Sequence, residues 1–195
     1  MHDEVRYSKI GYDVIKQEAL ALEQLASRID DSFAKACQIL LGCKGHIIVM
    51  GIGKSGHIAK KIASTFLETG SPAFYIHSAE AKHGDSGMIT QRDIVIMLSK
   101  SGETEEILSI IPVIKRLKIP LISFTGNPHS KLAIAGTVNL DVSINNEACP
   151  LGLAPTASTT VALVMGNALA LTISYQRKQN LMKSEPITDL IFNEA

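Results

Sequence analysis

Two short segments rich in glycine and serine have the composition of an anion-binding site. The first, Gly51-Ile52-Gly53-Lys54-Ser55-Gly56, follows an apolar run, and the second, Ser99-Lys100-Ser101-Gly102-Glu103-Thr104, follows another. Each precedes a stretch with helical spacing, so backbone N–H groups would point from a helix N-terminus toward a bound anion. Uncharged hydroxyls and amides suit a phosphate monoester, and we therefore predict a phosphate site between these segments.

The first segment also matches two nucleotide-binding patterns, but neither fits its context. A nicotinamide site needs an acidic residue at the end of the second strand. This chain has Ile76-His77-Ser78 there, and the first carboxylate after the strand is Glu80. A P-loop would place a glycine at Ile48, inside a strand. The alternatives that stay open are a tight glycine turn without ligand and, for the second segment, ordinary helix capping by Ser or Thr.

Two further polar segments are expected near the same crevice. Glu80-Ala81-Lys82-His83-Gly84-Asp85 follows the second strand, and its charged neighbours could tune the pKa of His83 toward neutrality. Glu147 lies in the loop 145–156 after the fifth strand. A solvated histidine and an exposed loop carboxylate are the simpler interpretations.

The elements that position these residues alternate along the chain. Two helices are expected over residues 8–42, with Asp30 and Asp31 placed to cap the second. Short apolar runs predict buried parallel strands, and the stretches between them have helical spacing. The strands are expected at 46–50, 73–76, 94–98, 121–124 and 138–142, and the helices at 55–68, 104–117, 129–135 and 156–175. This alternation predicts a doubly wound α/β sheet, in which the first and third strands, and so both serine-rich loops, are neighbours.

Composition limits the class of protein. The 195 residues are 46% hydrophobic and carry 19 basic and 19 acidic side chains, a net charge of zero. A neutral chain is disfavoured as a nucleic-acid binder, and an apolar one as a disordered segment. We expect a single domain over 1–195: a helical segment 8–42, a core 45–178 and a polar tail 180–195.

Cysteine spacing and the start of the chain predict the compartment. Cys37, Cys43 and Cys149 show neither a disulfide framework nor a zinc-binding spacing. The first residues lack the apolar core of a signal peptide, and no run is expected to approach the ~20 apolar residues of a membrane span. The expectations are a cytoplasmic protein with no metal and no membrane partner.

Several stretches resemble the sugar isomerase (SIS) domain family, and within it the arabinose-5-phosphate isomerases of Kdo biosynthesis. The matching stretches are MGIGKSGHIAKK, HSAEAKHGDSGMI, SKSGETEEI and, most specifically, EACPLGLAPTASTT followed by VALVMGNALA. The resemblance implies a three-layer αβα sandwich around a five-stranded parallel sheet of flavodoxin-like order, and a homotetramer. It also implies interconversion of D-ribulose 5-phosphate and D-arabinose 5-phosphate through a cis-enediol, for lipopolysaccharide or capsule, without a cofactor.

The same resemblance implies roles for individual residues. Phosphate binding falls to Gly53, Ser55, Ser99, Ser101, Gly102 and Thr104, and the catalytic set comprises Lys54, His83, Glu106 and Glu147. Isomerisation needs a base to move a proton and donors to stabilise the enediolate. Glu147 or a histidine would move the proton, Lys54 would polarise the oxygen, and Glu106 would orient Lys54 or His83. A solvated helix-face carboxylate is an equal alternative for Glu106.

Two departures from the family pattern leave other functions open. Family members usually carry a histidine in a His-Pro-Gly-Gly-like segment after the last helix, whereas this chain has none beyond His129. The sequence also shows no match to the pair of CBS modules that many members append, so the expectation is an SIS-only form of the family. The alternatives are a regulatory module that binds a sugar phosphate without turnover, and an isomerase for another phosphosugar.

Overall fold

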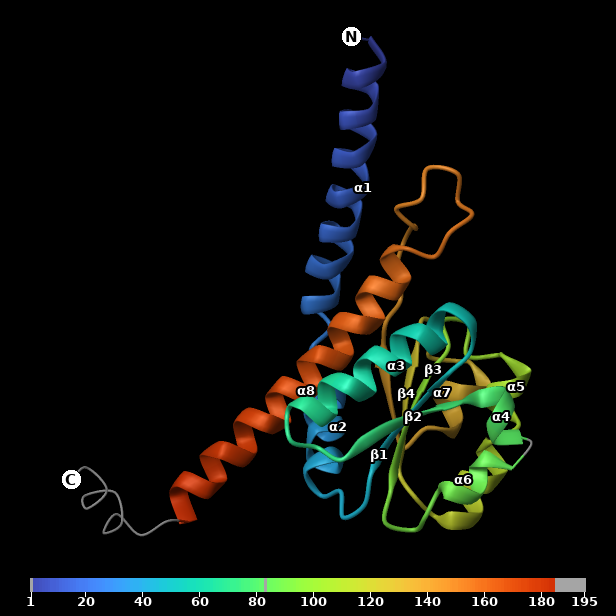
Figure 1. Cartoon of the computed structure of the whole chain (residues 1–195), viewed down its shortest axis with the longest axis vertical. Helices are drawn as coiled ribbons and strands as arrows, with labels where there is room; N and C mark the ends of the chain where they lie inside the picture. The colour runs from blue at the N-terminus through green and yellow to red at the C-terminus, as the bar shows by residue number, and fades with distance from the viewer. Residues whose placement is uncertain (1, 83, 185–195) are drawn as a thin grey trace, which may run out of the picture.

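A five-stranded parallel sheet forms the centre of the computed structural model, which describes residues 2–82 and 84–184 (Figure 1). The strands are β1 (Ile47–Gly51), β2 (Ala73–His77), β3 (Ile94–Leu98), β4 (Leu121–Thr125) and β5 (Val138–Asp141). All neighbouring strands pair in parallel, in the order β2-β1-β3-β4-β5. The predicted doubly wound, flavodoxin-like sheet is confirmed, with β1 beside β3 at the point where the strand order reverses.

Helices cover both faces of this sheet. They are α1 (His2–Ala26), α2 (Asp31–Leu41), α3 (Gly53–Glu68), α4 (Ser78–Lys82), α5 (Glu105–Leu108), α6 (Ile111–Leu117), α7 (Lys131–Ala135) and α8 (Ala157–Ser184), with a 3-10 turn at Asp85–Met88. Successive strand residues point to opposite faces. In β1, Ile47 and Val49 therefore join the core under α2, α3 and α8, whereas Ile48 and Met50 join the core under α4 to α7. The result is the three-layer αβα sandwich.

The predicted helix over 104–117 is wrong in one respect, because the structure divides it into α5 and α6. Pro112 occupies the first turn of α6. Proline has no N–H, and its ring would clash with the carbonyl of Leu108, four residues earlier in a continuous helix. The chain therefore breaks at residues 109 and 110 and restarts with proline in the first turn, where a helix tolerates it.

One smaller expectation also needs correction. Only Asp30 caps α2: its carboxylate accepts the N–H groups of Ser32 and Phe33 at 2.8 and 3.3 Å, and Asp31 is the first helical residue.

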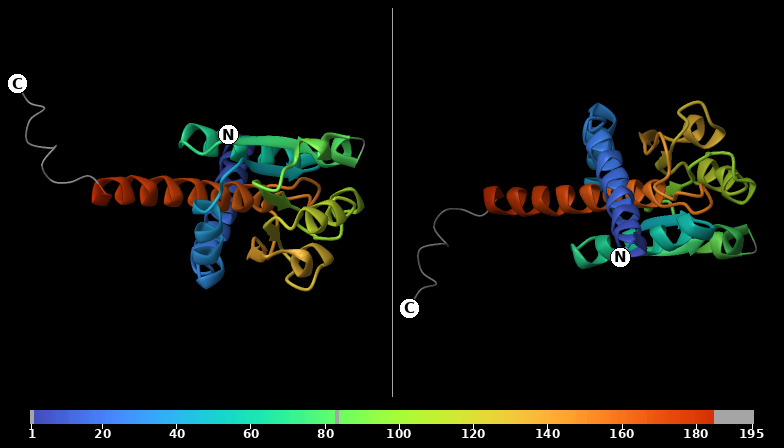
Figure 2. Two further views of the ribbon diagram at one scale, coloured as in Figure 1. Left: turned by 90° about the horizontal axis from the view of Figure 1, so that it is seen from below. Right: turned by 90° about the horizontal axis from the view of Figure 1, so that it is seen from above.

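The last helix is longer than expected. α8 continues to Ser184, so residues 180–184 of the predicted polar tail are helical, and the rest of that tail lies outside the described residues. By length and composition alone, Ala157–Met182 could cross a membrane, contrary to the expectation that no run approaches such a span. One of its faces is occupied in this fold, because Val161, Met165, Leu169 and Ile173 are fully buried in the core shared with α3. Figure 2 shows α8 extending past the rest of the fold.

Candidate active site

Both serine-rich loops lie at the carboxyl edge of the sheet, where ligands bind in doubly wound folds. β1 ends at Gly51 and α3 begins at Gly53, while β3 ends at Leu98 and the second loop follows directly. Because β1 and β3 pair in parallel from Ile47 opposite Ile94, the two loops emerge side by side. The predicted meeting of the loops is confirmed.

The second loop is held in a compact form by its own hydroxyl groups. The Ser99 and Thr104 hydroxyls lie 2.9 Å apart in a hydrogen bond, and the Gly102 N–H donates to Ser99 Oγ at 3.1 Å. The Glu103 N–H donates to Ser101 Oγ at 3.2 Å. These bonds close the loop in a curved form before α5 begins, so the hydroxyls are fixed in place before any ligand binds.

Gly102 is required for this curve. Its φ of +68° lies in the left-handed region that side chains disfavour, and a Cβ there would overlap the Ser130 side chain. Ser130 has little room to yield, because its hydroxyl donates to Asn127 O at 2.7 Å and accepts the Ala133 N–H at 3.3 Å. The glycine therefore lets the loop rest directly on the start of α7.

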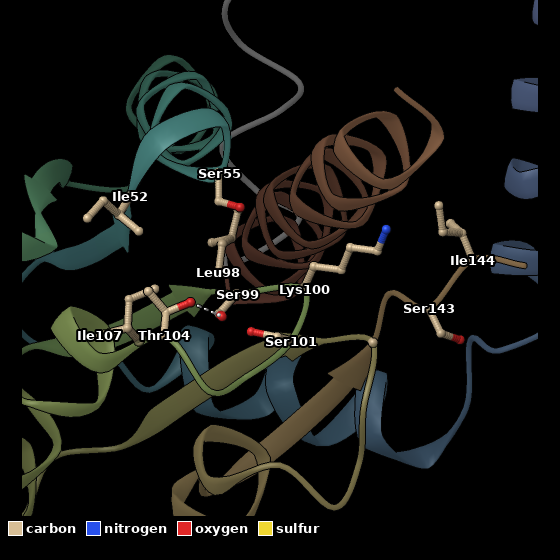
Figure 3. Close-up of a pocket in the computed structure, with 11 residues that line it drawn as sticks. Ile52, Ser55, Leu98, Ser99, Lys100, Ser101, Thr104, Ile107, Ser143 and Ile144 are labelled. Atoms are coloured by element: carbon tan, nitrogen blue, oxygen red, sulfur yellow. Dashed lines mark hydrogen bonds between the residues drawn. The ribbon is translucent and has the colours of Figure 1, made fainter. Parts of the chain in front are cut away.

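A cavity of about 460 Å³ opens between the two loops (Figure 3). Its polar lining comprises Ser55, Ser99, Lys100, Ser101, Thr104 and Ser143, and its apolar floor includes Ile52, Leu98 and Ile107. Figure 3 shows the hydroxyls of Ser55, Ser101 and Thr104 directed toward one space. A smaller cavity of about 140 Å³ adjoins it, shares Ser55, Ser99 and Lys100, and adds Lys54 and Ser158. The two cavities together form one recess, and the predicted phosphate-binding hydroxyls surround it.

Glu147 lines neither cavity, but it adjoins them through hydrogen bonds to Lys100 and Ser158, which line the smaller one. Its carboxylate accepts hydrogen bonds from Lys100 Nζ at 2.8 Å, from Ser158 Oγ at 2.5 Å, and from the N–H groups of Thr156 and Ser158 at 2.9 and 3.1 Å. These amides lie at the start of α8, where a negative charge is stabilised. Burial raises the pKa of the Glu147 carboxyl, but the hydrogen bonds from Lys100, Ser158 and Thr156 outweigh it and bring the pKa to about 2. Glu147 is ionised at neutral pH.

Of the other predicted catalytic residues, one lines a cavity of the recess. Lys54 lines the smaller cavity beside Ser55. Glu106 is exposed as the second residue of α5 and lines neither cavity. His83 lies outside the described residues.

Sequence reasoning misses three residues at this site. Lys100 resembles a spacer between two serines, although it lines both cavities and pairs with Glu147. Ser158 resembles an ordinary residue of the last helix, and its contact with Glu147 depends on how the loop 147–156 folds back. Ser143 lines the larger cavity, with its hydroxyl fixed by Arg28 Nη1 at 2.6 Å.

Comparison with known proteins places this site in a family. The sequence pattern of the SIS domain matches residues 40–172, which include both serine-rich loops and Glu147. The chain belongs to the SIS domain family. It is 59% identical over 153 residues to the arabinose 5-phosphate isomerase KdsD of Pseudomonas aeruginosa, covering 78% of this chain and 47% of that protein. It is 51% identical over 167 residues to KdsD of Escherichia coli K12, covering 86% and 51%. This SIS chain therefore spans about half the length of the curated relatives it matches.

A solved structure matches the SIS chain over nearly its whole length. The protein c3406 of E. coli CFT073, solved in complex with arabinose 5-phosphate, superposes with a TM-score of 0.84 at 42% identity, covering 91% of this chain and 93% of that one. The similarity confirms the predicted SIS fold independently of the longer relatives.

Proposed function

We propose that this SIS chain is an aldose-ketose isomerase that interconverts D-ribulose 5-phosphate and D-arabinose 5-phosphate. The observation that carries the proposal is the single recess between the two serine-rich loops, lined by hydroxyls and cations at the carboxyl edge of the sheet. The names of the KdsD relatives and the arabinose 5-phosphate bound to c3406 support this substrate. The product would serve Kdo synthesis for lipopolysaccharide or capsule in the cytoplasm.

In the proposed reaction the phosphate anchors the sugar and acid-base groups act on C1 and C2. The hydroxyls of Ser55, Ser99, Ser101 and Thr104 bind the phosphate with the amides of Gly53 and Gly102. Starting from the ketose, a base removes a proton from C1, the C2 carbonyl oxygen gains a proton, and a cis-enediol forms. A proton is then returned to C2 while the O1 hydroxyl loses its proton, which yields the aldose without any external oxidant or reductant.

Two groups in the described structure have the charge and place for these steps. Glu147 is an ionised carboxylate beside the recess and is the proposed base. Lys54 lines the smaller cavity, and its ammonium would stabilise the negative oxygen of the enediolate. His83 and Glu106 remain predicted catalytic residues. No contact in the described structure supports a role for either of them.

A homotetramer is proposed together with this activity. Figure 1 shows α1 projecting away from the sheet, and its outer turns expose Tyr7, Ile10, Tyr12 and Ile15. Leu151 and Leu153, in the loop before α8, are also more than three-quarters exposed. Large apolar side chains gathered on a projecting element are typical of a subunit interface.

Turnover of a defined substrate tests the proposed function. We expect the purified chain in D₂O to convert D-ribulose 5-phosphate to D-arabinose 5-phosphate labelled at C2, measured by NMR, because the enediol exchanges its proton with solvent. No conversion, with sugar phosphates still raising the melting temperature, would instead identify a regulatory binding module, since a ligand that binds only the native state stabilises it by mass action.

A further inference from the structure

Lys100 is a cationic side chain of the recess to which the proposed reaction assigns no role. It lies between Ser99 and Ser101 in the second serine-rich loop, residues 99–104, and lines both the larger and the smaller cavity. With Lys54, it is one of two cationic side chains among the residues that line these cavities in the described part of the chain. The side chain is 56% exposed, so it has room to move within the recess.

The ion pair between Lys100 and Glu147 is asymmetric. Lys100 Nζ lies 2.8 Å from Glu147 Oε1. The Glu147 side chain is only 15% exposed, and its carboxylate also accepts hydrogen bonds from the start of α8. If Lys100 moved away, the carboxylate would keep the Thr156 and Ser158 donors and remain satisfied. The lysine is therefore the mobile partner of this pair, since its side chain is exposed and makes no other hydrogen bond in the described structure, whereas Glu147 is fixed by several donors.

A phosphate group in the recess would compete for this lysine. A phosphate monoester carries about −1.5 to −2 charges near pH 7, more than a single carboxylate does, and offers three acceptor oxygens. Lys100 is attached to the loop whose hydroxyls would surround those oxygens. The electrostatic attraction between Lys100 and the phosphate should therefore exceed that between Lys100 and Glu147 when both are within reach.

From this geometry we infer that Lys100 is a substrate-binding residue. Its ammonium pairs with Glu147 in the absence of ligand, and it leaves Glu147 to bind the phosphate when a sugar phosphate binds. The inference rests on the proposed function for the identity of the ligand. It adds a second consequence, because departure of the ammonium removes one of the hydrogen bonds that keep Glu147 a weak base. Besides Lys100, the titratable groups that share a cleft with Glu147 are Asp13 of α1 and Cys149 of its own loop, and neither replaces the lost positive charge.

The test compares Lys100→Met with a matched variant of another lysine ion pair. Lys131 Nζ lies 2.9 Å from Glu103 Oε2 on the far side of the same loop and lines neither cavity, so Lys131→Met is the control. Calorimetric affinities are measured for D-arabinose 5-phosphate and for inorganic phosphate, with Lys100→Arg as the conservative variant. We expect Lys100→Met to weaken both ligands on the order of 10-fold, Lys100→Arg to restore most of the loss, and Lys131→Met to match the wild type.

Each outcome decides the inference separately from the proposed function. Unchanged affinity in a folded Lys100→Met protein would overturn the role of Lys100 while leaving isomerisation untouched. Equal losses in Lys100→Met and Lys131→Met would also overturn it, by showing a general effect of charge. Weaker binding in Lys100→Met alone would support it even if the wild type showed no turnover. If the wild type bound neither ligand, both the inference and the proposed function would fail.

Discussion

Replacing Glu147 by glutamine is expected to lower isomerase turnover on the order of 100-fold or more, the scale for a positioned acid-base group. Glutamine keeps the shape of the side chain and a carbonyl oxygen for the Thr156 and Ser158 amides, but it cannot accept a proton from C1. Because Lys100 would lose its resting partner, inorganic phosphate should bind at least as tightly as to the wild type. The measurements are steady-state kinetics and calorimetry.

The control for this prediction is Glu105→Gln, which changes an exposed carboxylate at the start of α5. Its turnover should equal that of the wild type. If Glu147→Gln also turned over at a near-normal rate, Glu147 would be an anchor for α8 and not the base.

The pH dependence of stability gives a second readout of the same substitution. The folded pKa of Glu147, about 2, is lower than the ordinary value of 4.5 for this group, so the ionised carboxylate stabilises the fold fully above about pH 5. That contribution is lost as the pH falls from about 5 toward 2, where the folded state must also take up a proton. The difference in unfolding free energy between wild type and Glu147→Gln should therefore shrink over this range in urea titrations. A difference that stayed constant from about pH 7 to about pH 3 would show that the carboxylate is not stabilised as the structure indicates.

Gly102→Ala is expected to destabilise the protein by about 2–5 kcal/mol and to abolish measurable sugar phosphate binding. The left-handed φ of +68° costs a residue with a Cβ about 1–2 kcal/mol, and overlap with the Ser130 side chain adds a packing cost of about 1–3 kcal/mol. Relief of that overlap would move the loop away from α7 and displace the Ser99 and Thr104 hydroxyls. Urea unfolding and calorimetry measure the two effects.

Gly152→Ala is the matched control for this effect. Gly152 has a similar φ of +65°, but nothing lies within 4 Å of the position its Cβ would take. We expect it to cost only the left-handed backbone conformation, about 1–2 kcal/mol, with binding unchanged. Equal losses at the two glycines would mean that strain alone, and not the contact with Ser130, fixes the phosphate loop.

Most of the fold follows from local patterns in the sequence. The apolar runs of β1, β3 and β4 are buried on both faces, so each is continuous enough to find within one or two residues. Periodicity does not predict the break between α5 and α6. Pro112 is visible in the sequence, but the helical spacing of apolar residues continues on both sides of it and indicates one helix. The full length of α8 escapes it too, because the outer turns of this helix are polar and gain little from the core.

The site is predictable only where its residues are close in sequence. Ser99, Ser101 and Thr104 are positioned by hydrogen bonds within one loop, and their grouping is visible in the sequence. The contacts of Glu147 with Lys100 and Ser158 span 47 and 11 residues, and they depend on the path of the loop before α8. No local pattern encodes that path, so the anchoring of Glu147 and the role of Lys100 emerge only from the structure.

A crystal structure of this chain with D-arabinose 5-phosphate would test the central claim, that the recess between the two serine-rich loops binds the phosphate. The account predicts phosphate oxygens about 2.5–3.0 Å from the hydroxyls of Ser55, Ser101 and Thr104, and Lys100 Nζ turned from Glu147 toward the phosphate. A phosphate bound elsewhere, such as in the cleft between α1 and residues 146–150, would contradict it.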